Sequence, residues 1–140
     1  MTSQPPHGGF DARALHIIRV AFLIGPLAFG TFVWFFLGDA AEPRVDVDVA
    51  RSFGLVFLAV TVAAAFALLL LRVQRGRTTE LQKKIGLTIA GWAIGEGVGL
   101  FGGVLYMLSA DRLPFLVGLA ILFVSMMMLP LPVVGAPDEL

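Results

Sequence analysis

One acidic side chain, Glu96, lies inside an otherwise uncharged stretch and is the residue best placed to do chemistry. The nearest charged residues along the sequence are Lys84 before it and Asp111 after it. In a helix those separations correspond to about 18 Å and 22 Å along the axis. A glutamate side chain cannot reach that far, so Glu96 would be remote from both water layers if this helix crosses a membrane.

An ionised acid at the centre of a membrane helix costs about 2.5–3.5 kcal/mol on insertion scales. The cost falls if the carboxyl keeps its proton or finds a partner, so we expect a neutral Glu96 that faces protein or a watery cavity. Thr61 is predicted at a matching depth and could donate to it, which makes Glu96 and Thr61 the ion-binding candidates. Two interpretations stay open: a reversible proton or cation site, and a hydrogen bond to a neighbouring helix worth about 0.6 kcal/mol.

Other kinds of site find little support in the sequence. The absence of cysteine excludes disulfides and thiolate metal sites, and the two histidines both lie near the N-terminus, so we expect no metal site. There is no phosphate-binding glycine loop, nucleophile–histidine pairing or pair of carboxylates in one apolar segment. We therefore expect no enzyme and no cofactor. A formal net charge of +0 gives no basic field for nucleic acid.

The elements that must position Glu96 are apolar. The chain has 140 residues, of which 58% are hydrophobic and 14% charged, with a mean hydropathy of +0.90. Such a chain suits lipid better than water. No segment alternates between polar and apolar residues as the strands of a membrane barrel do. We predict an all-α integral membrane four-helix bundle with spans at about 15–37, 52–71, 85–109 and 113–131.

The predicted domain is a single four-span unit at 15–134, between a flexible tail at 1–14 and a short tail at 135–140. A cleaved signal peptide is the alternative for the first segment, but its uncharged run from Val20 to Leu37 is longer than a signal core. For the fourth span, Pro114 suits the first helical turn and Asp111 can cap it.

Basic residues predict the orientation, because cytoplasmic loops carry an excess of Lys and Arg. Seven of them fall on one predicted side, and only three on the other, together with most of the acids of the loops. Both termini should therefore face the cytoplasm, in a bacterial inner (cytoplasmic) membrane. The seven are Arg13, Arg19, Arg72, Arg75, Arg77, Lys83 and Lys84, and the three are Arg44, Arg51 and Arg112.

Small residues suggest how the helices pack. Four glycines recur every four residues in the third span, a spacing that lets another backbone approach closely. Alanines recur in the same way in the second span, so we expect these two helices to meet. Pro26 removes a hydrogen bond from the first span and is a candidate hinge or static bend. The packing candidates are Gly91, Gly95, Gly99, Gly103, Ala59, Ala63 and Ala67.

The surroundings of Glu96 resemble a known family. Glu96 is followed by Gly97-Val98-Gly99 and then by Leu100-Phe101-Gly102. This pattern is similar to that of the c-type proteolipid subunits of rotary ATPases, over about 55 residues of the second and third spans. The resemblance implies that Glu96 binds the transported proton or sodium ion. Four-helix proteolipids are duplicated hairpins, and Ile24-Gly25-Pro26 matches Ile94-Gly95-Glu96, so two tandem transmembrane hairpins are expected on this interpretation.

The third span also resembles that of a broad group of uncharacterised bacterial four-helix membrane proteins, a likeness that carries no activity. Three functions follow as expectations. The first is a structural or accessory subunit of a membrane complex with a buried protonatable carboxylate. The others are a proteolipid-like ion-binding subunit and a small oligomeric transporter. The expected partners are the lipid bilayer and either further copies of the chain or other membrane subunits.

Overall fold

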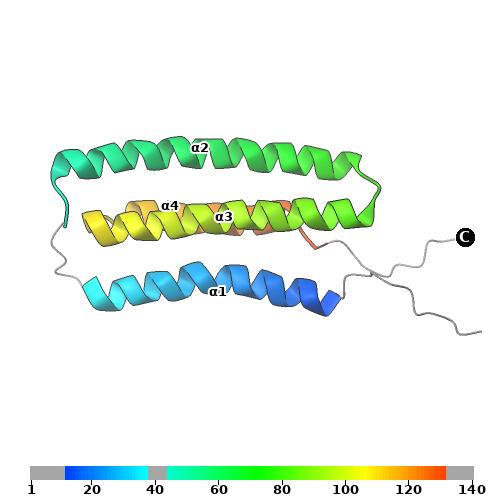
Figure 1. The fold of residues 1–140 in the computed structure, drawn as a ribbon, viewed down its shortest axis with the longest axis horizontal. Coiled ribbons are helices and arrows are strands. Elements are labelled where there is room, and N and C mark those ends of the chain that lie inside the picture. Colours follow the sequence, from blue (N-terminus) through cyan, green and yellow to red (C-terminus); the bar gives the residue numbers. More distant parts are fainter. Residues whose placement is uncertain (1–11, 38–43, 132–140) are drawn as a thin grey trace, which may run out of the picture.

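The computed structural model describes residues 12–37 and 44–131, which form four α-helices (Figure 1). This confirms the all-α, four-helix prediction. The first three helices are long and apolar enough to cross a membrane, whereas the fourth is shorter. The helices are α1 (Ala12–Leu37), α2 (Val47–Arg77), α3 (Leu81–Ser109) and α4 (Leu113–Met128).

Several helix boundaries differ from the prediction by three residues or more, and α3, for example, begins at Leu81 and not at about 85. Helix α1 begins at Ala12, so the last residues of the tail expected at 1–14 are helical, while residues 1–11 and 132–140 lie outside the described part of the chain. Helix α2 continues beyond its apolar core at both ends, from Val47 to Arg77. Hydropathy marks the part of a helix that lipid can surround, and it does not mark the polar turns that extend it.

Helix α4 ends three residues before the predicted end of its span. It has 16 residues, which corresponds to about 24 Å, against about 30 Å for a bilayer core. The reason is Pro130, because a proline disfavours helical geometry in the residue before it. Leu129 accordingly leaves the helix with φ −122° and ψ 70°.

The turn from α3 to α4 is short and well capped. Ala110 has φ 59°, the left-handed conformation in which its N–H bonds to Tyr106 O at 2.9 Å. Asp111 Oδ1 then accepts a hydrogen bond from Leu113 N–H at 2.9 Å, and Pro114 occupies the first turn. Both predictions for the start of this helix are therefore confirmed: Asp111 caps it, and Pro114 lies in its first turn.

Helix α3 is the central helix of the bundle. It packs along α4 over most of its length, and α1 and α2 lie on opposite sides of this pair (Figure 1). In the described part of the chain, α1 and α2 make no contact with each other. Of the two tandem hairpins expected, α3 and α4 pack as a hairpin, whereas the α1–α2 pair does not.

The core consists of two apolar clusters on either side of α3. One joins Trp92 of α3 to Leu122 and Met126 of α4, with Phe22 of α1 packed against it. The other joins Phe57 and Ala64 of α2 to Val98 and Leu105 of α3. These clusters fix α1 and α2 separately to the central pair.

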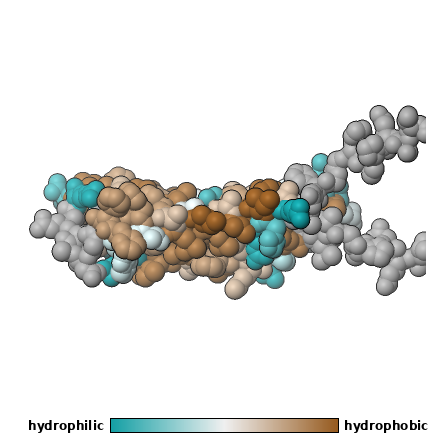
Figure 2. Space-filling view, turned by 90° about the horizontal axis from the view of Figure 1, so that it is seen from below, coloured by the Kyte–Doolittle hydropathy of each residue, from teal (hydrophilic) through white to brown (hydrophobic). Residues whose placement is uncertain are grey.

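The outer surface is apolar over the middle of the bundle. Figure 2 shows hydrophobic residues there and hydrophilic residues toward both ends. Large side chains of α1 and α2 are exposed on it, among them Phe35 at 80% and Phe66 at 63%. Such a surface is the reverse of a water-facing one, in which large contiguous apolar patches are rare.

Candidate functional site

Glu96 lies on α3 at the interface with α1, and its side chain is half-buried. A methyl group on Gly25 of α1 would lie 2.8 Å from Glu96 Oε1. The carboxyl therefore occupies the space that a larger residue at position 25 would need. Within the described residues the carboxyl has no hydrogen bond and no ion pair, so its polar atoms depend on water, lipid or a proton for compensation.

Helices α1 and α3 run in the same direction past this contact. One turn before Glu96, the ring of Trp92 meets Phe22 edge-on at 6.5 Å. One turn after it, Gly99 packs against Pro26 at ordinary van der Waals distance. Glu96 thus lies between an aromatic contact, one turn before it, and a proline contact, one turn after it.

The predicted partnership between Thr61 and Glu96 is wrong. Thr61 Oγ1 is buried with no hydrogen-bond partner among the described residues, and it lines a cavity of about 290 Å³ together with Pro114 and Val117 of α4. Glu96 instead faces α1, on the other side of the central pair. Matching depth was the only basis for the pairing, and depth does not specify which way a side chain points around its helix.

Pro26, the candidate hinge, is fully buried in an uninterrupted α1. Proline has no N–H, so the carbonyl of Phe22 lacks the donor that would normally come from four residues later. An acceptor is thereby left free within one turn of the point where Glu96 touches α1. Nothing in the geometry tests the hinge itself.

The glycines of α3 line interfaces mainly with α4 and α1, and only Gly91 also lies near α2, where a methyl group would be 3.4 Å from Leu68. A period of four residues turns by about 40° per step around a helix of 3.6 residues per turn. Gly95 accordingly meets Leu122 and Ser125 of α4, whereas Gly103 meets Phe29 of α1. Gly99, between them, lies against both helices, and Gly91 lies against Leu129.

The alanine ridge of α2 does not contact these glycines. Ala59 and Ala63 are exposed and Ala67 is only partly buried, while the buried small residue of this helix is Ala64. The second and third helices do meet, as expected, but through Phe57 and Ala64 and not through the alanine ridge. A spacing of four residues shows that side chains share one face of a helix. It does not show whether that face is buried in the bundle or exposed on its outer surface.

Sequence analysis missed the two closest backbone contacts of the bundle. A methyl group on Gly102 would meet the backbone of Pro114, with Phe115 Cα at 3.0 Å. One on Gly118 would lie 2.8 Å from Val98 O and 2.9 Å from Gly99 Cα. The sequence signal was present, since both are glycines in apolar helices, but neither belongs to the four-residue repeat.

Two side chains from other helices donate hydrogen bonds to the carbonyl groups that follow the end of α4. Trp92 Nε1 donates to Leu129 O at 3.1 Å, and Arg75 Nη2 donates to Pro130 O. Carbonyls at a helix end have no partner within their own helix, and leaving one unpaired in an apolar environment is costly. Trp92 is wholly buried for this reason as well as for its packing.

The described residues contain no cluster of three or more histidine, cysteine or acidic side chains that could hold a metal ion. Comparisons of the chain with protein-family models, curated proteins and solved structures find no significant match. The resemblance to c-type proteolipid subunits therefore stays a prediction.

Proposed function

We propose that this chain is a small multi-pass membrane protein that serves as a structural or accessory subunit of a membrane complex. In this function Glu96 is a neutral contact between α3 and α1. The observation that carries the proposal is the position of Glu96 Oε1 against Gly25, since the carboxyl is turned toward another helix of its own chain. Glycine at position 25 leaves the room that this approach needs.

The chemistry of α1 supports such a contact. A neutral carboxyl has one O–H to donate, and Pro26 leaves the carbonyl of Phe22 without its usual donor. In lipid, both groups gain by meeting, because neither can use water. A charged Glu96 would gain nothing from a carbonyl oxygen.

Membrane placement is supported by the three long apolar helices and by the apolar middle of the bundle (Figure 2). The basic residues around the junction of α2 and α3 favour a cytoplasmic position for that end, and we propose that both termini face the cytoplasm in a bacterial inner membrane. Washing membranes with alkaline carbonate tests this placement. The chain should stay in the membrane pellet, and its release without detergent would contradict the proposal.

Assembly with other subunits is supported by the outer face of α2. This helix exposes Ala59 and Ala63 among large apolar residues, and small residues are typical of membrane helix interfaces. Gentle extraction followed by native mass measurement should find the chain together with other subunits or with copies of itself. A monomer under all gentle conditions would argue against a subunit.

A second candidate function is a proton- or sodium-binding subunit. The partial exposure of Glu96 and the absence of a hydrogen bond to it within the described residues favour this alternative, because an exchangeable site needs an accessible carboxyl. A hydrophobic carbodiimide should then modify Glu96, and sodium or alkaline pH should protect it. Absence of labelling in native membranes would leave only the structural function.

A further inference from the structure

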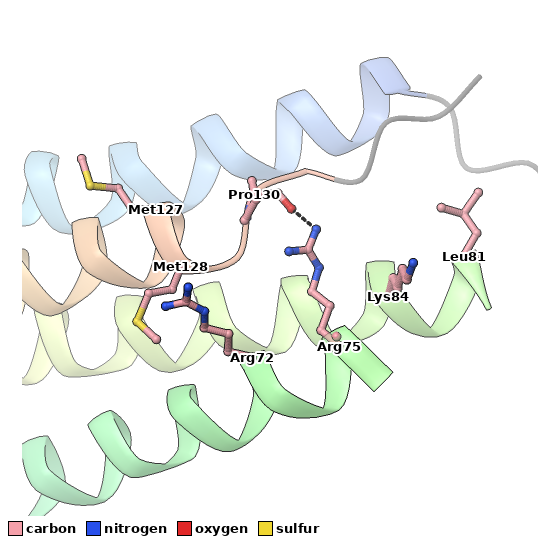
Figure 3. A pocket seen from close by; sticks show the side chains of 8 residues that line it. Arg72, Arg75, Leu81, Lys84, Met127, Met128 and Pro130 are labelled. Atoms are coloured by element: carbon pink, nitrogen blue, oxygen red, sulfur yellow. Dashed lines mark hydrogen bonds between the residues drawn. The ribbon is translucent and has the colours of Figure 1, made fainter. Parts of the chain in front are cut away.

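A second polar feature lies at the end of the bundle, remote from Glu96. A pocket of about 610 Å³ opens where α2 ends, α3 begins and the chain leaves α4. Figure 3 shows Arg72 and Arg75 reaching from α2 toward the end of α4, with Lys84 of α3 on the same pocket. The end of α4 is distant in sequence from the turn between α2 and α3, so the pocket depends on the folded bundle.

The charged lining of this pocket is entirely basic. Arg72, Arg75 and Lys84 line it, and no acidic side chain is among its lining residues. Like charges held close together repel one another unless an anion lies between them. The pocket is therefore suited to a compact anion such as a phosphate group.

One of the three basic side chains is already fixed. Arg75 donates through Nη2 to Pro130 O, while its Nε is buried and has no hydrogen-bond partner among the described residues. An unsatisfied donor on a positioned guanidinium is costly to bury and calls for an acceptor from outside the described residues, which a phosphate oxygen can be. Arginine presents its donors in a planar fork that matches phosphate oxygens.

The remaining wall is apolar and open. Leu81, Met127 and Met128 line the pocket beside the basic groups, and Met127 is 80% exposed. A free inorganic anion makes no use of such a wall, whereas the acyl chains of a lipid would lie along it. Basic pockets between membrane helices at the cytoplasmic surface are typical sites for acidic headgroups.

We propose that this pocket binds the phosphate headgroup of an anionic phospholipid. Arg72, Lys84 and the Nε of Arg75 donate to the phosphate, while Arg75 Nη2 holds the end of α4 in place. The acyl chains run past Met127. The inference rests on the membrane placement proposed above and is independent of any function of Glu96. The proposed site binds one lipid specifically, which is more than the general attraction of basic residues to anionic headgroups.

The test uses the full chain in a non-ionic detergent, with cardiolipin, phosphatidylglycerol or phosphatidylcholine added at equal mole fraction. Bound lipid is counted by native mass measurement and affinity is obtained by titration. We expect an anionic lipid to stay bound and phosphatidylcholine to be lost. Each of Arg72→Gln and Lys84→Gln should weaken binding about fivefold, since one basic residue near an anionic surface contributes about that factor.

Neighbouring residues provide matched controls. Lys83 and Arg77 carry the same charge at the same end of the bundle and do not line the pocket, so Lys83→Gln and Arg77→Gln should bind lipid like the parent chain. Equal weakening in these controls would reduce the site to general charge attraction and overturn the proposal.

Inorganic phosphate, titrated against the bound lipid, distinguishes the two sources of the anion. It should compete with the lipid only at far higher concentration. Competition at concentrations similar to those of the lipid would show that the pocket selects a free anion and would overturn the lipid assignment. The carbonate wash is read first, so failure of membrane placement is recognised before any lipid is tested.

Discussion

The carboxyl of Glu96 lies against Gly25, so close that a methyl group on the glycine would be 2.8 Å from Oε1. The atom it would meet is the far end of a flexible side chain, which can turn aside, and not part of the backbone. This contact thus controls where the carboxyl points more than it controls whether the bundle folds.

Substitution Gly25→Ala should therefore redirect the carboxyl at little cost in stability. We expect the free energy of unfolding to change by less than about 1 kcal/mol, since alanine is also the better helix former. The rate at which a carbodiimide modifies Glu96 should change several-fold. Gly97→Ala is the matched control, because a methyl group there meets nothing within 4 Å. An equal rate change in the control would show that the contact is not responsible.

Substitution Glu96→Gln should leave the protein folded and assembled. The amide has the volume of the acid and still offers a donor and an acceptor, so the change in unfolding free energy should stay near 0.6 kcal/mol, about the average for a hydrogen bond between membrane helices. Reversible unfolding in mixed micelles and native mass measure the two quantities. Loss of a proton-dependent activity with intact assembly would favour the ion-binding alternative.

The close backbone approach of α3 and α4 predicts the most damaging glycine substitutions. Gly102→Ala and Gly118→Ala place a methyl group against backbone atoms of the facing helix, which cannot turn aside. We expect each to lower the free energy of unfolding by about 1–3 kcal/mol, the usual cost of overpacking. Gly86→Ala, where a methyl group meets nothing within 4 Å, should be neutral or stabilising. A neutral result at both interface positions would contradict the packing.

The hydrogen bond from the indole N–H of Trp92 should stabilise the end of α4 locally. Trp92→Phe keeps a ring in the core but removes the donor to Leu129 O, which should cost about 1–2 kcal/mol. Hydrogen exchange should then rise in the last turn of α4. Trp34, half exposed on α1, supplies the control substitution Trp34→Phe, for which no such rise is expected.

The exposed alanines of α2 predict an effect on assembly without an effect on folding. Ala63→Leu should weaken association between subunits, as seen by native mass, and leave thermal unfolding of the chain unchanged. Ala65 is also exposed, on a different face of the helix, so Ala65→Leu is the matched control. Equal loss of association in both variants would argue that α2 faces lipid alone.

The positions of the helices in the sequence could be predicted from hydropathy. Which face of each helix packs against which other helix could not. In water, the apolar stripe of a helix identifies its buried face, but in lipid both the buried and the outer faces are apolar. For that reason Ala63 and Ala64 could not be distinguished in the sequence, although only Ala64 is buried. Thr61 was paired with Glu96 on depth alone and faces elsewhere.

Glycine was the more reliable signal, because close approach of two backbones permits almost no other residue. It identified α3 as an interface helix and α2 as one of its neighbours, but it did not show that α1 and α4 also pack on α3. The contacts of Trp92 and Arg75 with the end of α4 could have been anticipated from Pro130. A proline at that point ends the helix in an apolar setting, and the freed carbonyls require donors from elsewhere.

The separation of α1 from α2 has a consequence for biogenesis. With the membrane placement proposed above, these two helices enter the bilayer first, yet their described residues make no contact with each other. Each must remain in lipid as an independent span until α3 arrives between them. The bundle is therefore completed only after synthesis of its second half, and a chain that stops before residue 81 would contain two helices and no tertiary structure.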